Sequence, residues 1–157
     1  ARGGDSIAAV GHPRILALRS FGKFYGLAGL RLGFLLGTAP FVRRFKEALG
    51  DWPVSADALA AGLAAYPDAD WAARTRIRLA RDAARLDKLL IACGFSIVGG
   101  TNLFRLARAP DAPRRFEALC AEGILTRPFA EAPDWLRFGL PRSRDWRRLE
   151  AVLKRLA

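Results

Sequence analysis

The residues best placed by type and spacing to carry out chemistry lie in segment 18–33, where one lysine stands among four glycines. Ser20 precedes Lys23 by three residues, and Arg31 follows it by eight. Glycines let a backbone reverse and approach a ligand closely, so Ser20 and Arg31 can meet. A hydroxyl and a guanidinium together match a phosphate group, and a lysine amine in apolar surroundings can act as a nucleophile. The pattern therefore indicates a reactive lysine beside a phosphate clamp.

A reactive lysine and a phosphate-binding group are the least that a protein needs to hold pyridoxal 5'-phosphate (PLP), whose aldehyde bonds to a lysine amine. The plainer alternative is a mobile surface lysine in a glycine-rich hairpin. A phosphate loop of the GxxxxGK[ST] type is a third possibility, but that spacing is absent and no Ser or Thr follows Lys23. The first two interpretations stay open on the residues alone.

A second candidate is Arg137, in the apolar segment 136–140. Its neighbours alternate onto one face of an expected strand and leave the arginine on the other. A guanidinium on a free face suits a bidentate grip on a carboxylate. The alternative is an exposed arginine on an edge strand.

The elements that must position these residues follow from the apolar pattern. Segment 15–18 predicts a strand buried on both faces, and segment 71–93 predicts one long amphipathic helix with an inward stripe formed by Leu79, Ala83, Leu86, Leu90 and Cys93. The other expected strands are 31–36, 95–98, 103–107, 124–127 and 136–140, and the other expected helices are 41–49, 58–66, 114–122 and 144–156. The fold class is α/β, with a boundary expected near Arg76 between parts 1–75 and 76–157. The four tryptophans are expected to pack.

Composition limits the function classes. The net charge is +11, but the arginines are scattered and form no basic run, so no nucleic-acid partner is expected. The longest apolar stretch, 32–42, is interrupted and too short to span a membrane. Cys93, Cys120 and His12 stand apart, which argues against a metal site and favours reduced thiols in the cytoplasm. The absence of methionine leads us to expect a piece of a longer protein.

Segment 18–33 resembles the PLP-lysine signature of the class I/II aminotransferase superfamily, the fold type I PLP enzymes. The resemblance implies that Lys23 bonds to PLP and that Ser20 and Arg31 bind the cofactor phosphate. It also implies that the chain is the C-terminal part of such an enzyme: the end of the large-domain sheet followed by the small α/β domain. Many members carry Ser or Thr where this chain has Gly22, so one phosphate hydrogen bond is missing or comes from the backbone.

Segments 51–55, 99–106, 123–129 and 135–141 extend the resemblance over essentially the whole chain. Within the superfamily they are most similar to the threonine-phosphate decarboxylases of cobalamin biosynthesis, which are related to histidinol-phosphate aminotransferases. This likeness implies a lyase that converts L-threonine O-3-phosphate to aminopropanol phosphate. By the same likeness, Arg137 binds the substrate α-carboxylate and Arg127 lies near the substrate phosphate. We expect Asn102 and Arg105 to serve the fold.

Two alternatives to the decarboxylase remain. One is an aminotransferase of the histidinol-phosphate type, and the other is an inactive fragment or interaction domain. The resemblance further implies a small phosphorylated amino acid as substrate, a homodimer and a cytoplasmic location.

Overall fold

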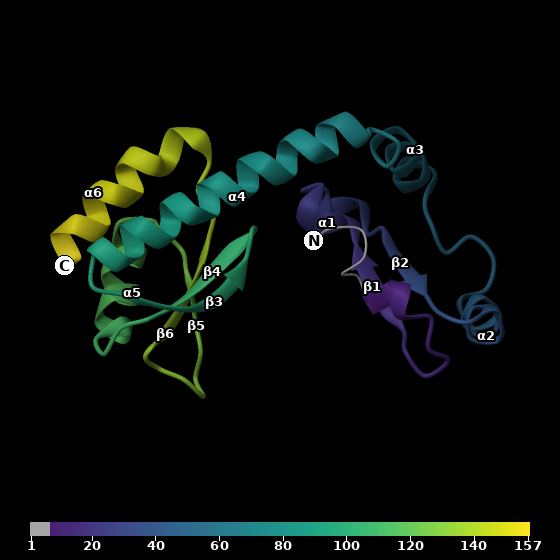
Figure 1. The fold of residues 1–157 in the computed structure, drawn as a ribbon, viewed down its shortest axis with the longest axis horizontal. Coiled ribbons are helices and arrows are strands. Elements are labelled where there is room, and N and C mark those ends of the chain that lie inside the picture. Colours follow the sequence, from purple (N-terminus) through teal and green to yellow (C-terminus); the bar gives the residue numbers. More distant parts are fainter. Residues whose placement is uncertain (1–6) are drawn as a thin grey trace. The chain divides into compact units, whose positions relative to one another are not determined.

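The chain forms two compact units, and the boundary between them in the sequence lies at the start of the longest helix (Figure 1). The computed structural model describes residues 7–157. Unit 1 comprises the described residues up to Ala69, and unit 2 is Asp70–Ala157. The domain division at 75/76 stays a prediction, and residues 1–6 of its first part lie outside the described residues.

Unit 1 is built around a two-stranded antiparallel sheet, β1-β2. The register pairs Ala17 with Leu36 at one end and Ser20 with Gly33 at the other. A short helix follows β1 directly, and one 3-10 turn lies between that helix and β2. The elements are 3-10 turns Ile7–Val10 and Ala28–Leu30, strands β1 Ala17–Ser20 and β2 Gly33–Leu36, and helices α1 Phe21–Phe24, α2 Ala39–Leu49 and α3 Ala56–Ala65.

The expectation that the first strand is buried on both faces is wrong for this chain. Ala17 is the one buried residue of β1, and Leu18 is 80% exposed. Burial on both faces needs packed layers above and below a sheet. Among the described residues, β2 is the only strand that pairs with β1.

The helices α2 and α3 are confirmed, and their starts have clear local causes. Pro40 stands in the first turn of α2, where its missing N–H is not needed, so the helix begins ahead of the expected residue 41. Ser55 caps α3, with its side chain accepting a hydrogen bond from the Ala58 N–H. Between them, Trp52 is 94% exposed with φ at 63°, so the packing expected for this tryptophan is wrong. Trp146, by contrast, is buried.

Unit 2 is a four-stranded antiparallel sheet, in the order β3-β4-β6-β5, with helices packed against it (Figure 1). Its elements are helices α4 Ala69–Ala92, α5 Ala112–Ala121 and α6 Trp146–Leu156, and strands β3 Ser96–Thr101, β4 Phe104–Arg108, β5 Arg127–Pro128 and β6 Trp135–Gly139. The long helix is confirmed, and every member of its predicted inward stripe is buried.

The helices cover one face of this sheet. Leu86 and Leu90 of α4, Leu119 of α5 and Leu153 of α6 are fully buried and share one cluster with Leu136 of β6. Each buried leucine contributes about 1.5–3 kcal/mol relative to exposure. Residues on the other face of β6 are therefore free to serve a ligand.

The strand expected at 124–127 is mostly replaced by a helix end. Gly123 has φ at 68°, its N–H bonds to the Cys120 carbonyl, and the Ile124 N–H reaches back to the Leu119 carbonyl. This pattern terminates α5 in the manner of a Schellman motif. Only Arg127 and Pro128 pair with β6, and proline has no N–H with which to extend the ladder.

Candidate functional site

The structure brings the three residues predicted for the PLP site together. Ser20, Lys23 and Arg31 line one open pocket of about 400 Å³ in unit 1. The charged residues that line it are Arg19, Lys23 and Arg31, so all of its charged groups are cationic. A concave site of this size with cations and one hydroxyl is suited to a small anionic ligand.

The strand-to-helix junction sets Ser20 and Lys23 in place. Ser20 ends β1 opposite Gly33 of β2, and α1 begins at the next residue. Its backbone is extended, with φ at −101°, and its side chain makes no capping bond to α1. The hydroxyl is therefore available to a ligand, and Lys23 follows within a single helical turn.

Phe21 anchors this junction to the sheet. It is 1% exposed, stacks on Tyr25 with ring centroids 4.4 Å apart, and meets the Phe34 ring edge-on at 6.5 Å. Its N–H donates to the Leu32 carbonyl at 3.1 Å. These ring contacts thus hold the helix that carries Lys23. Lys23 itself is exposed, so the apolar surroundings considered for its amine are not present in this structure.

Arg31 adopts a backbone conformation that the sequence analysis missed. It was expected to open a strand, but it lies in the left-handed region with φ 54° and ψ 31°. Its N–H and its Nη1 both donate to the Ala28 carbonyl, at 3.3 and 3.2 Å. Arginine has no special preference for this region, so no feature of the local composition signals it. Such a residue is worth a functional explanation.

Unit 2 holds a second pair of predicted residues. Leu136 and Phe138 are buried at 0% and 2% exposure, so Arg137 projects from the opposite face of β6, as the alternation predicted. Arg127 of β5 is its direct partner in the antiparallel register. Side chains of directly paired residues lie on the same face of a sheet, so the two arginines are neighbours there.

Neither arginine of this pair forms an ion pair within the described part of the chain. The Arg137 guanidinium lies 5.2 Å from the centre of the Phe104 ring, and that of Arg127 lies 5.3 Å from the Phe129 ring. Aromatic faces hold guanidinium groups without neutralising them. The pair therefore presents two positive charges on one face of the sheet, an arrangement that suits a carboxylate or a phosphate.

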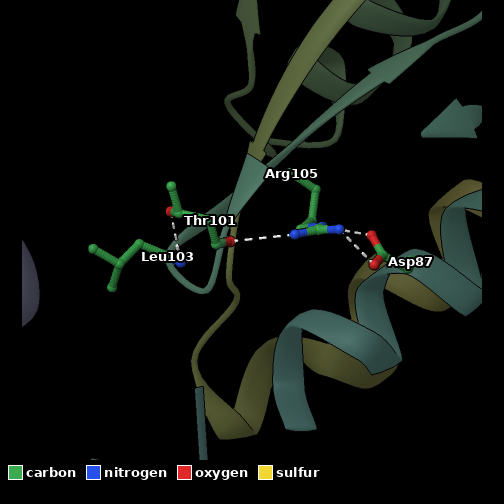
Figure 2. Close-up of polar contacts among 4 residues, drawn as sticks. All are labelled: Asp87, Thr101, Leu103 and Arg105. Atoms are coloured by element: carbon green, nitrogen blue, oxygen red, sulfur yellow. Dashed lines mark hydrogen bonds and ion pairs between the residues drawn. The ribbon is translucent and has the colours of Figure 1, made fainter. Parts of the chain in front are cut away.

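Arg105 shows the contrasting arrangement of an arginine that serves the fold. Its Nε and Nη2 donate to the two carboxylate oxygens of Asp87 on α4, at 2.6 and 2.7 Å (Figure 2). Its Nη1 also approaches the Thr101 carbonyl at 3.5 Å, beside a turn in which the Leu103 N–H bonds to the Thr101 hydroxyl (Figure 2). The charge of Arg105 is satisfied internally, as expected for a structural residue.

Within the described residues 7–157, no group of three or more His, Cys, Asp or Glu side chains could hold a metal ion. Within the same range, no helix combines the length and apolarity that a membrane crossing requires.

Comparison with known proteins gives a consistent result. A model of the aminotransferase class I and II family matches residues 5–156. The chain is 44% identical over 149 residues to a threonine-phosphate decarboxylase from Sinorhizobium sp, covering 94% of the chain and 44% of that protein. It is 41% identical to a threonine-phosphate decarboxylase from Pseudomonas aeruginosa, over 95% of the chain and 45% of that protein.

Aminotransferases are similar to a lesser degree. Histidinol-phosphate aminotransferase 2 of P. aeruginosa is 36% identical over 93% of the chain and 41% of its own length. Among solved structures, histidinol-phosphate aminotransferase from Sinorhizobium meliloti in complex with PLP matches with a TM-score of 0.79 at 23% identity, over 92% of the chain and 42% of that protein. L-threonine-O-3-phosphate decarboxylase from Porphyromonas gingivalis matches with a TM-score of 0.72 at 20% identity, over 92% and 47%.

These structural matches show the fold, and the chain spans less than half the length of each relative.

Proposed function

Because the chain belongs to the aminotransferase class I and II family, we propose that it is part of a PLP-dependent enzyme that decarboxylates L-threonine O-3-phosphate. The observation that carries the cofactor proposal is the shared pocket of Ser20, Lys23 and Arg31. The choice of decarboxylation is supported by the identity of 41–44% to two threonine-phosphate decarboxylases.

The pocket fits the chemistry of PLP. The cofactor carries a phosphate, which suits the Ser20 hydroxyl and the Arg31 guanidinium, and an aldehyde, which suits the Lys23 amine. The available hydroxyl of Ser20 and the wholly cationic charge of the lining support this assignment. In the proposed enzyme, Ser20 and Arg31 would hold the phosphate, and the Lys23 amine would condense with the aldehyde with loss of water.

Unit 2 supplies the proposed substrate residues. Arg137 binds the α-carboxylate of the substrate, and Arg127, its cross-strand neighbour, binds the phosphate on the threonine side chain. PLP, when bound, supplies an electron sink that accepts the electron pair of whichever Cα bond is aligned with its π-system. The orientation in which Arg137 holds the carboxylate therefore selects the bond that breaks.

In the proposed reaction the Cα–carboxylate bond breaks, CO₂ leaves and Cα takes up a proton, which gives aminopropanol phosphate. We place this product in cobalamin biosynthesis, and the enzyme in the cytoplasm as a homodimer, as parts of the same proposal. The second candidate is an aminotransferase of the histidinol-phosphate type, which the 36% identity to such an enzyme favours. In that reaction the Cα–H bond breaks and a 2-oxo acid accepts the amino group.

The test uses the full-length protein with L-threonine O-3-phosphate. Release of CO₂ without any 2-oxo acid is the expected result, whereas amino-group transfer that depends on an added 2-oxo acid would establish the second candidate. Borohydride reduction in the presence of PLP, followed by peptide mapping, should label Lys23. Lys23→Ala should abolish the label, and Lys46→Ala, which changes a lysine of α2 outside the pocket, should not. A full-length protein that neither binds PLP nor turns over substrate would leave the third alternative, an inactive fragment or interaction domain.

A further inference from the structure

We propose that Gly22 is a positioning residue, whose missing side chain lets the turn 28–30 close against α1 and so sets Arg31 for the cofactor phosphate. This inference rests on the proposed function, because it concerns the same pocket. It assigns a role to Gly22, which directly precedes Lys23 and stands where the resemblance leads us to expect Ser or Thr.

The contact itself is unusually close. A Cβ on Gly22 would lie 2.7 Å from the Ala28 Cα, 3.0 Å from the Ala28 Cβ and 3.3 Å from the Ala28 nitrogen. The nearest obstacle is backbone, which cannot swing aside as the tip of a flexible side chain can. Any side chain at position 22 must therefore displace the backbone of residue 28 or of α1.

That displacement reaches Arg31 through a single carbonyl. The Ala28 carbonyl accepts both the backbone N–H of Arg31, at 3.3 Å, and its Nη1, at 3.2 Å. The same peptide group thus fixes the left-handed backbone of Arg31 and the direction of its guanidinium. The close contact between Gly22 and Ala28 therefore couples the position of the Ala28 carbonyl to the residue that precedes Lys23.

The lack of room for a side chain, and not a need for positive φ, explains why position 22 is glycine. Gly22 lies within helix α1, and its φ is not positive, unlike that of Gly26 at 71°. Gly29, in the same 3-10 turn as Ala28, has open space where a Cβ would go and no positive φ. Gly29→Ala is therefore a matched control that adds the same methyl group without the collision.

A hydroxyl added at position 22 should have the opposite effect to the one that its hydrogen-bonding capacity suggests. Gly22→Ser introduces a hydroxyl directly before Lys23, which could bond to a phosphate, yet it should weaken PLP binding because the collision displaces Arg31. Gly22→Ala should act in the same direction. Loss of one hydrogen bond to a charged group corresponds to a tenfold to hundredfold loss of affinity, as an order-of-magnitude estimate.

The experiment measures the dissociation constants of PLP and of pyridoxal, which lacks the phosphate, with the full-length apoprotein. For Gly22→Ala and Gly22→Ser the ratio of PLP affinity to pyridoxal affinity should fall about tenfold or more, with pyridoxal binding unchanged and Gly29→Ala like wild type. Tighter PLP binding by Gly22→Ser, or equal losses for both ligands, would overturn the inference. A wild-type protein that fails to bind PLP at all would instead refute the proposed function.

Two further variants keep the test decisive. Arg31→Lys and Gly22→Ala should combine without additive loss of PLP affinity, because both act through one guanidinium; full additivity would contradict the proposal. If Gly22→Ala does not fold, Ala28→Gly loosens the same carbonyl without crowding. An unaltered PLP-to-pyridoxal ratio in Ala28→Gly would then count against the role assigned to this contact.

Discussion

Replacing Arg127 with glutamine should make the ligand-free protein slightly more stable and, at the same time, weaken its binding of a phosphorylated amino acid. Arg127 and Arg137 are direct partners across β5 and β6, and neither forms an ion pair within the described residues. Like charges placed directly opposite each other in a sheet are destabilising by an amount of order 0.2–1 kcal/mol. Because Arg127 is exposed, solvent screens the repulsion, and we expect a gain of about 0.5 kcal/mol or less.

The loss of binding should be larger than this gain in stability. A hydrogen bond to a charged group contributes about 1.5–3 kcal/mol, which corresponds to roughly a tenfold to hundredfold change in dissociation constant. Isothermal titration of the full-length protein with O-phospho-L-threonine measures the affinity, and urea unfolding of the ligand-free protein measures the stability. Arg137→Gln should weaken binding at least as much.

Arg108→Gln is the matched control. Arg108 is also a sheet arginine of unit 2, but its Nε donates to the Asp134 carboxylate at 2.5 Å, so its charge is already neutralised. Removing it should change stability by less than about 1 kcal/mol, since the pair is on the surface, and should leave ligand affinity unaltered. If Arg127→Gln and Arg137→Gln both destabilise the protein by more than about 1 kcal/mol and bind the ligand normally, the two arginines serve the fold and the reasoning fails.

Three further predictions concern the scaffold. Ser55→Ala should lower the unfolding free energy by about 1 kcal/mol, measured by urea titration, because α3 loses its N-terminal cap; an unchanged midpoint would contradict the capping role. Hydrogen bonds from Arg114 and Arg115 lower the pKa of Asp111, so its stabilisation is present above the unfolded-state pKa and is lost as pH falls through the lower folded value. Asp111→Asn should therefore flatten the acid side of the unfolding-midpoint profile, and an identical profile would rule this out. Burial raises the pKa of the Cys93 thiol, so Cys93 should react with iodoacetamide at neutral pH only once urea unfolds the protein; rapid labelling of Cys93 in the folded protein, distinguished by peptide mapping from the partly buried free thiol of Cys120, would disprove it.

The positions of the site residues could be predicted where local chemistry dictates them. The spacing of Ser20, Lys23 and Arg31 around a glycine-rich reversal was sufficient to predict that they share a site, and they line one pocket. The face occupied by Arg137 followed from the alternation of its apolar neighbours. The cross-strand pairing of Arg127 with Arg137 was not predicted, because the register of two strands depends on which residues form the turn between them.

The errors in the fold arise where tertiary context overrides a local pattern. The apolar run around Leu18 was interpreted as a doubly buried strand, yet burial depends on neighbouring layers that a strand does not itself encode. The run after Gly123 has the composition of a strand, but its first residues complete the hydrogen bonds of a helix end. Trp52 was expected to pack by residue type alone, and residue type does not determine whether a partner surface is present.

The backbone conformation of Arg31 gives independent support to the proposal that its side chain binds an anion. A left-handed backbone is unfavourable for a non-glycine residue by about 1–2 kcal/mol, and glycine would adopt it freely. The segment already uses glycine at three nearby positions, Gly26, Gly29 and Gly33, yet it has arginine here. The hydrogen bond from this guanidinium to the Ala28 carbonyl is exposed to solvent and contributes about 1 kcal/mol at most. That contribution at best offsets the strain and adds no net stability, which supports the proposal that the Arg31 side chain binds an anion in the pocket.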